Sequence, residues 1–377
     1  MVTARPSYSR IKTALKAINE HPDLELQLVV AASALLHRYG SAISFIKEDG
    51  FKIAAQVYMV LEGENPTTMA KTTGLGLMEL STSFDNLKPD VVVTVADRYE
   101  TLATAVAAAY MNIPVAHVQG GEVTGSIDEK VRHTVTKLSD LHFVCTKKAA
   151  ERVIRMGEDP KTVFVTGCPS IDLVAEMLPN PALDFNPFLK YGGVGTSLDL
   201  SRGYLVVMQH PVTTEYELAR QHITETLYAA KEINLPALVF WPNVDAGSDG
   251  TSNGIRSFRE QEKLAQFHFF KNMAPTDFLK LIFNSRGLIG NSSVGIRESS
   301  FLGVPVVNIG TRQSGRERGR NVLDVAYDRG EITRAIRHHM GNGSYPRDSI
   351  YGDGNAGNKI AELLAKVVLK IEKQLTY

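Results

Sequence analysis

Short apolar runs alternate with helix-length amphipathic segments along this chain of 377 residues, and this alternation constrains the fold more than any other feature. Uninterrupted Val, Leu and Ile runs are typical of parallel strands covered on both faces. Helical segments between such runs indicate right-handed βαβ units. In the first half we expect strands at Glu25–Ala31, Ile53–Leu61, Asp90–Val95, Val115–Val118, Leu141–Cys145 and Thr162–Val165, and helices that include Ser9–Asn19, Thr101–Met111 and Asp128–Leu138.

The pattern breaks at residues 178–202, a Pro- and Gly-rich stretch without periodicity that is typical of a linker. It then restarts, with expected strands at Tyr204–Met208, Ala237–Phe240, Phe267–Phe270, Gly287–Ile289 and Val306–Asn308. We therefore expect a Rossmann-like domain over residues 1–177, a second over 203–355, and a C-terminal helix within 356–377, from about Lys359 to Leu375. Two doubly wound α/β domains of this size are expected to face each other across a cleft that binds the substrate.

The composition is that of an ordinary globular enzyme, with 44% hydrophobic and 22% charged residues. Lys plus Arg and Asp plus Glu both number 41, so the balance does not suggest binding to nucleic acid or to a membrane surface. Cys145 and Cys168 are the two cysteines, too few for a disulfide framework or a structural metal cage, and a reducing cytoplasm is the expected compartment. We expect no metal site, because His, Cys and carboxylate residues do not cluster at ligand spacing. We also expect no membrane-spanning segment, because no apolar run reaches roughly 18 residues.

A small-residue turn, Gly290–Glu298, follows a strand and opens a helix, so its backbone N–H groups and the hydroxyls of Ser292 and Ser293 could hold a diphosphate. An ordinary N-cap explains the same residues. The segment Thr311–Arg320 follows the next strand and holds four arginines, which fit phosphate neutralisation. A solvated charged loop is the alternative for that segment.

Other polar residues lie at the carboxyl ends of predicted parallel strands, where open α/β folds place their sites. They are Asp97 and Arg98, Gln119 and Glu122, and His210, with Asp128 at the start of the next helix. Each of them alone has a structural explanation as a cap, a turn residue or a residue at the core edge. Their repeated location favours a functional site.

Several ordered motifs together resemble the hydrolysing, sialic-acid-type branch of the UDP-N-acetylglucosamine 2-epimerases. The resemblance runs from Thr3 to about Asp324. The motifs are Arg5–Ser9, Asp97–Glu100, His117–Asp128, Arg132-His133, Gly167–Ser170, His210–Thr214, Pro242–Gly247, Gly290–Glu298 and Gly310–Gln313.

This resemblance implies a glycosyltransferase-B-like arrangement and a role for each matched residue. Arg5 and Ser9 would lie near the nucleotide, Ser292 and Ser293 would hold the diphosphate, and Glu298 would bind the ribose. Arg312 and Asn243 would face the sugar and phosphates, with Arg98 also binding substrate and His210 near the leaving group. Asp97 and Asp128 match two carboxylates assigned to catalysis. The resemblance also implies no cofactor and a homodimer or homotetramer.

Gln119 departs from the family pattern, because many members carry Glu at this position and an amide cannot act as a carboxylate base. Glu122 is a possible substitute for it. The change could also mark another sugar, such as a diacetamido-trideoxy analogue.

The implied reaction converts UDP-N-acetylglucosamine into N-acetylmannosamine and UDP. Because the C2 hydrogen is not acidic, we expect elimination of UDP to a glycal and then rehydration, with proton transfer by two groups on opposite faces. A non-hydrolysing 2-epimerase, a glycosyltransferase of the same architecture and a catalytically silent nucleotide-sugar-binding protein remain as alternatives.

Overall fold

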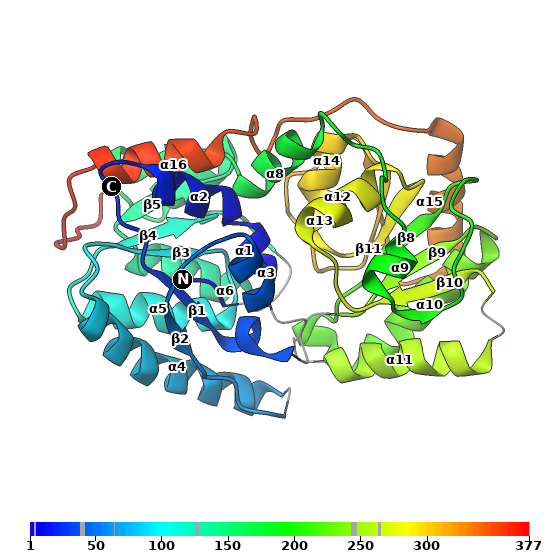
Figure 1. Ribbon diagram of the computed structural model, residues 1–377, viewed down its shortest axis with the longest axis horizontal. Coiled ribbons are helices and arrows are strands. Elements are labelled where there is room, and N and C mark those ends of the chain that lie inside the picture. Colours follow the sequence, from blue (N-terminus) through cyan, green and yellow to red (C-terminus); the bar gives the residue numbers. More distant parts are fainter. Residues whose placement is uncertain are drawn as a thin grey trace. The chain divides into compact units, whose positions relative to one another are not determined.

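The computed structural model describes residues 1–3, 5–37, 42–63, 65–124, 128–242, 247–262 and 265–376, without the side chains of Arg5 and Pro6. The chain forms two compact units. Unit 1 comprises Met1–Val123, Ile127–Ala175 and Tyr351–Tyr377, and unit 2 comprises Thr124–Ser126 and Glu176–Ile350. Both are α/β units built on parallel strands (Figure 1).

Unit 1 contains six strands, β1 (Leu28–Ala31), β2 (Ile53–Val57), β3 (Val92–Val95), β4 (Val115–Val118), β5 (Leu141–Val144) and β6 (Val163–Val165). Its helices are α1 (Arg5–Ser9), α2 (Lys12–Glu20), α3 (Ala42–Glu48), α4 (Pro66–Leu87), α5 (Tyr99–Tyr110), α6 (Asp128–Leu138), α7 (Lys147–Arg155), α8 (Pro169–Met177, which crosses the boundary) and α16 (Ala356–Lys366). Short 3-10 turns lie at Ala32–Leu35 and Pro160–Thr162.

The residues before α1 complete the strand order of unit 1. Val2 forms a parallel bridge with Val30 of β1, and the amino group of Met1 donates to the carbonyl of Val93 in β3 at 2.6 Å. Met1 and Val2, a stub of a strand, therefore link the β1–β2 pair to the β3–β4–β5–β6 sheet. Counting the stub as strand 1, the order begins 3-2-1-4-5-6, as in doubly wound nucleotide-binding folds, and its switch point lies where the stub meets β3.

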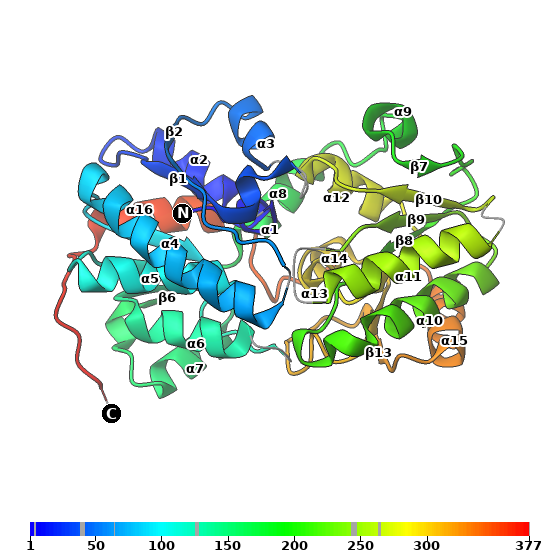
Figure 2. The same ribbon diagram turned by 90° about the horizontal axis from the view of Figure 1, so that it is seen from below.

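Alternate residues of these strands supply two apolar cores, one on each face of unit 1. Leu28 and Val30 pack with residues of α2, α3 and α16, whereas Val29 and Ala31 pack with residues of α4, α5 and α6. Figure 1 shows α16 lying along α2, and Figure 2 shows α4 beside α5. Gly357 permits the first of these contacts, since a Cβ there would lie 2.6 Å from the Thr13 backbone.

Unit 2 has one sheet with the order β13-β12-β11-β8-β9-β10-β7, parallel except for the pairing of β7 with β10. The strands are β7 (Val194–Gly195), β8 (Leu205–Met208), β9 (Ala237–Phe240), β10 (Phe267–Phe270), β11 (Gly287–Gly290), β12 (Val306–Ile309) and β13 (Val322–Val325). The helices are α9 (Pro187–Tyr191), α10 (Ala219–Glu232), α11 (Ser248–Gln261), α12 (Pro275–Phe283), α13 (Ser293–Ile296), α14 (Glu298–Leu302) and α15 (Arg329–Asn342), with a 3-10 segment at Thr213–Leu218.

Without β7, this order is again that of a doubly wound fold, and its switch point lies between β8 and β11. Helices α10, α11 and α15 pack on one face of the sheet. On the other face, Phe278 of α12 meets Phe240 edge-on at 5.0 Å between ring centroids. Both units therefore have the layered Rossmann-like architecture that the alternation of segments predicts.

Several segments differ from what the sequence predicts. The stretch expected to be an aperiodic linker contains α9 and β7, and the β7 residues Val194 and Gly195 pair with Phe269 and His268. Strand β13 was not expected. The last helix ends at Lys366 rather than near Leu375, and residues 367–376 continue without regular structure.

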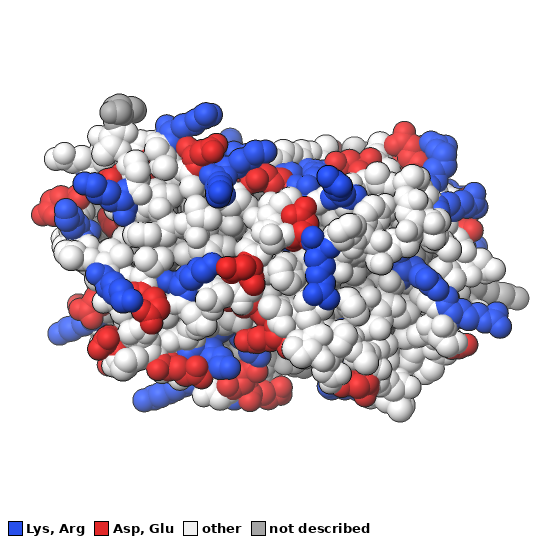
Figure 3. All heavy atoms as spheres, turned by 90° about the horizontal axis from the view of Figure 1, so that it is seen from above, with Lys and Arg blue, Asp and Glu red and all other residues white. Residues whose placement is uncertain are grey.

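The surface mixes charges of both signs over the face shown in Figure 3, without a broad area of one sign. None of the helices in the described part of the chain combines the length and the apolar character needed to span a bilayer. Within the same residues, no three His, Cys, Asp or Glu side chains gather as a metal site would require.

Candidate active site

Asn291 joins the two strand ends at the switch point of unit 2. Its side-chain oxygen accepts from the His210 N–H at 2.8 Å, and its amide nitrogen donates to the His210 carbonyl at 2.9 Å. Asn291 is fully buried and His210 is 4% exposed. Since both backbone groups of His210 are satisfied by one rigid amide, this histidine has a fixed position beside the Gly290–Glu298 turn.

Gly290 allows the turn to approach β8 closely. Its φ is +135°, and a Cβ there would lie 2.2 Å from the carbonyl oxygen of Met208. No other residue type fits this position without moving the backbone. The glycine is therefore a requirement of the turn, as the small-residue pattern predicts.

The two serines of the turn do not behave as an ordinary cap. Ser292 is the N-cap residue of α13, but its side chain makes no capping hydrogen bond. Ser292 and Ser293 are largely buried. Glu298 begins α14 at 6% exposure, and its Oε2 has no hydrogen-bond partner among the described residues. A buried carboxylate oxygen without a donor is costly, so this geometry favours a ligand with hydroxyl groups beside Glu298.

Arg312 lies next to this turn, as expected from the neighbouring strands β11 and β12. Its Nη1 donates to the Asn291 carbonyl at 3.2 Å, and Gln313 donates to the same oxygen at 2.8 Å. Two of the other arginines are engaged inside the loop instead. Arg316 donates to the Gln313 side chain at 2.9 Å, and Arg318 donates to the Gln313 carbonyl at 2.7 Å. Arg312 thus contacts the backbone of the residue directly before the two serines.

A group of residues that the sequence did not single out supports the Arg312 loop. The Tyr327 ring stacks on His222 with centroids 3.5 Å apart, and Thr311 donates to Glu215 at 2.7 Å. Burial, followed by the charge of Glu215, raises the pKa of Tyr327 to about 12, against the opposing effects of Asn291 and Arg312. Tyr327 follows β13, so the missed strand also concealed this residue.

In unit 1, Asp97 follows β3 and is held by two arginines. It is buried and forms ion pairs with Arg132 of α6 and, at 3.7 Å, with Arg10. Arg132 is 1% exposed and also donates to the carbonyl of Glu122 at 2.9 Å. Arg132 therefore brings together Asp97, the Glu122 segment and the helix that begins at Asp128. From the sequence, Arg132 is recognised only as part of a motif.

His117 fixes the turn that precedes Asp97. Its Nε2 lies 2.8 Å from the carbonyl of Ala96, and its Nδ1 lies 3.2 Å from the hydroxyl of Thr136. Burial lowers the pKa of His117 to about 4, so the ring is neutral at physiological pH. It then donates from Nε2 to Ala96 and accepts from Thr136. This matters because Ala96 has a φ of +65°, which a non-glycine residue adopts only at a cost.

Gln119 lies in the interior of unit 1. It is fully buried with a φ of +71°, and its amide donates to the sulfur of Cys168 at 3.0 Å. Cys168 in turn lies 3.0 Å from the Ser170 hydroxyl. The Gln119 Oε1 has no hydrogen-bond partner among the described residues. Glu122, three residues on, is also buried.

The remaining predicted residues are Arg98, Ser9, Asp128, Asn243 and Arg5. The Arg98 guanidinium makes two hydrogen bonds of 3.1 Å to the fully buried Glu100, which gives it a structural role beside the predicted one. Ser9 ends α1, next to Arg10, and Asp128 begins α6. Asn243 and the side chain of Arg5 lie outside the described residues.

Comparison with known proteins gives one consistent family. Residues 16–365 match the model of the UDP-N-acetylglucosamine 2-epimerase family. The chain is 32% identical to a UDP-N,N'-diacetylbacillosamine 2-epimerase (hydrolyzing) of Legionella pneumophila over 97% of this chain and 94% of the relative. It is 34% identical to the polysialic acid biosynthesis protein P7 of Escherichia coli, over 88% and 83%.

Among solved structures, the fold resembles that of a UDP-GlcNAc 2-epimerase from Neisseria meningitidis bound to UDP-GlcNAc, with a TM-score of 0.79 and 17% identity over 97% of this chain and 98% of that one. The family model covers nearly the whole chain, including the strand-end residues of both units described above. The chain belongs to the UDP-N-acetylglucosamine 2-epimerase family.

Proposed function

We propose that this protein is a hydrolysing 2-epimerase that converts UDP-N-acetylglucosamine into N-acetylmannosamine and UDP. The proposal is supported by the position of Ser292 and Ser293 directly after β11, by the hydrogen bond of Arg312 to the carbonyl of Asn291 beside them, and by the buried Glu298 later in the same turn, in a chain of this family. Hydroxyl and guanidinium donors match a diphosphate, and an acceptor carboxylate matches ribose hydroxyls.

In this proposal unit 2 supplies the nucleotide contacts and stabilises the leaving group. Breaking the C1–O bond places additional negative charge on the departing UDP. Arg312 and the two serines would stabilise that charge, and so would Arg5. His210, fixed by Asn291, would meet the phosphates or the leaving oxygen. Ser9, Arg98 and Asn243 remain further candidates for substrate binding.

Unit 1 would supply the proton transfers. One carboxylate of the pair Asp97 and Asp128 removes the C2 proton as UDP leaves, which produces the glycal. Water then adds at C1, and the other returns a proton to C2 from the opposite face. Support comes from Arg132, which ties Asp97 to the helix that begins at Asp128. Glu122 is a third candidate for this acid–base chemistry.

A second sugar has specific support. Relatives from Legionella pneumophila and Campylobacter jejuni, 32% and 30% identical, are both named as diacetylbacillosamine 2-epimerases of the hydrolyzing type. Their names also favour hydrolysis over retention of UDP. UDP-N,N'-diacetylbacillosamine is therefore the alternative substrate for the same chemistry.

Incubation with each nucleotide sugar in deuterated water tests the function. From UDP-N-acetylglucosamine we expect free UDP and free N-acetylmannosamine carrying deuterium at C2, because rehydration of the glycal delivers a solvent deuteron to that carbon. Nuclear magnetic resonance of the products identifies both. A product still linked to UDP would indicate the non-hydrolysing reaction. UDP release only with an acceptor would indicate a transferase, and tight UDP binding without turnover would indicate a silent binding protein.

Replacing either aspartate should abolish most of the turnover. We expect Asp97→Asn and Asp128→Asn each to lower kcat roughly a hundredfold or more, the scale of a lost general acid or base. The two should differ in stability: Asp97→Asn leaves the buried Arg132 without its main counter-charge, whereas Asp128 begins a helix where Asn is tolerated. Thermal denaturation and steady-state kinetics measure both effects. Near-normal turnover in both variants would refute the assignment.

Removing the diphosphate donors should weaken UDP binding. For Ser293→Ala with Arg312→Ala we expect Kd to rise at least about tenfold, since charge-assisted hydrogen bonds contribute roughly 1.5–3 kcal/mol. Arg320→Ala is the matched control, because Arg320 is exposed in the same loop. Titration calorimetry with UDP measures all three proteins. Unchanged affinity in the double variant would contradict the proposed site.

Gln119→Glu should not increase activity. A carboxylate there would be fully buried, would replace the amide that donates to Cys168 and would add negative charge to the unit that holds Asp97 and Asp128. We expect turnover similar to or lower than that of the wild type, with a lower melting temperature. Gln119→Ala serves as the control for loss of the amide. A rise in UDP release of about tenfold or more would show instead that position 119 takes part in proton transfer.

A further inference from the structure

The segment 367–376 lies against the C-terminal end of α6. Beyond Lys366 it runs without regular structure and is fixed near the turn after α7. Thr376 donates its N–H to the Gly157 carbonyl at 3.0 Å, and a Cβ on Gly157 would lie 2.9 Å from Cδ2 of Leu375. Because Gly157 has a φ of +88°, this turn both needs glycine and accommodates the segment.

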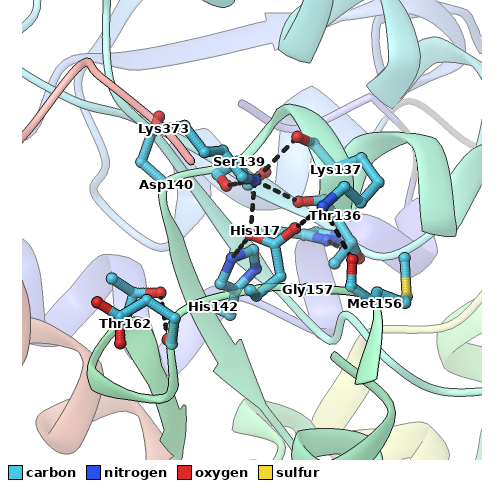
Figure 4. Close-up of polar contacts among 12 residues, drawn as sticks. His117, Thr136, Lys137, Ser139, Asp140, His142, Met156, Gly157, Thr162 and Lys373 are labelled. Atoms are coloured by element: carbon cyan, nitrogen blue, oxygen red, sulfur yellow. Dashed lines mark hydrogen bonds and ion pairs between the residues drawn. The ribbon is translucent and has the colours of Figure 1, made fainter. Parts of the chain in front are cut away.

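Lys373 reaches from this segment to carbonyls in the last turn of α6 and directly after it. Its ammonium donates to the carbonyls of Ser139 at 2.5 Å and Lys137 at 2.8 Å, and lies 3.3 Å from that of Thr136 (Figure 4). Such carbonyls lack partners within the helix and form the negative end of its dipole. A lysine at this place is a C-terminal cap, here supplied by a segment remote in sequence.

Glu158 compensates the charge of Lys373. It is 2% exposed and accepts from Lys373 at 2.6 Å, Lys137 at 2.5 Å and His142 at 3.0 Å. Burial raises the pKa of Glu158, but the hydrogen bonds from His142, Lys137 and Lys373 outweigh this and lower it to about 2. The three N–H bonds of Lys373 thus have a carboxylate and two carbonyls as partners.

Helix α6 makes the contacts that position Asp97, and it begins at Asp128. Thr136, in its last turn, bonds His117, which bonds the carbonyl of Ala96 directly before Asp97. Arg132, one turn earlier, pairs with Asp97 itself. Asp128 is the first residue of the same helix. The position of one helix therefore governs both candidate aspartates.

We propose that Lys373 is a positioning residue, which caps α6 and thereby holds this helix in the place that Asp97 and Asp128 need for the reaction. The inference rests on the proposed function. Lys373 acts through α6 and takes no part in proton transfer.

The test compares Lys373→Met, which removes the charge and keeps the length, with Lys370→Met. Lys370 is exposed in the same segment and serves as the matched control. We expect hydrogen exchange in the α6 peptide to be about tenfold faster in Lys373→Met. We also expect kcat to fall about tenfold or more with KM within about twofold, because misplaced groups slow the chemistry more than binding. Lys373→Arg should restore most of kcat, and Lys370→Met should match the wild type.

The readouts separate the possible failures. Unchanged exchange in Lys373→Met would overturn the cap, and faster exchange with normal kcat would overturn the positioning role. A wild-type protein without turnover of either nucleotide sugar would overturn the proposed function, and with it the positioning role, while exchange would still decide whether Lys373 orders α6. Circular dichroism checks that each variant is folded. If Lys373→Met is not folded, Lys373→Gln, which keeps a donor, replaces it under the same criteria.

Discussion

The ion pair between Arg132 and Asp97 is the interaction on which the candidate site of unit 1 depends. A guanidinium at 1% exposure must have its charge and its N–H groups satisfied by protein, because the loss of hydration is otherwise prohibitive. Asp97 supplies the charge and the Glu122 carbonyl accepts a further hydrogen bond. Two segments that follow different strands are thereby tied to one helix. A pair of this kind is a weak source of net stability but imposes one geometry.

In unit 2, the strand ends at the candidate site are joined by a neutral side chain, that of Asn291. Asn291 holds the ends of β8 and β11 together through two hydrogen bonds to the backbone of His210, and its own carbonyl receives Arg312 and Gln313. The amide adds no charge of its own. The nearby charged groups, Arg312 and Glu298, are consequently not consumed by the link between the strands.

The sequence predicted the fold well where burial on both faces leaves a clear signal. The expected bounds of β4, β9 and β10 coincide with the observed ones. Strand β13 was missed because it is an edge strand whose Asp324 is exposed, so no continuous apolar run marks it. The predicted last helix, which extends to about Leu375, is longer than the observed one, which ends at Lys366. Its amphipathic pattern continues past Lys366, but the tertiary contacts of Lys373 override that local preference.

For the site, sequence reasoning located the strand ends but not the side-chain partners. Sequence position alone predicts that Asp97, His210 and Arg312 lie at the carboxyl ends of parallel strands, because each of them follows a predicted strand. It cannot show that Arg98 turns back to Glu100, or that Arg316 and Arg318 bind within their own loop. Such pairings depend on the rotamers of neighbours that are distant in sequence, and arginine offers five donors to whichever acceptor is nearest.

Backbone strain gives the last constraint on Gln119. The residues directly after β1, β3 and β4 are Ala32, Ala96 and Gln119, and all three have positive φ angles. Glycine would adopt these angles at a lower cost, as Gly310 does after β12. A glutamine at such a position costs local stability, and contacts of its side chain can offset that cost. The Gln119 side chain makes a buried hydrogen bond to Cys168. Gln119 therefore links the β4 turn to the Gly167–Ser170 segment through an uncharged amide, whereas a carboxylate at this buried position would carry the cost of desolvating its charge.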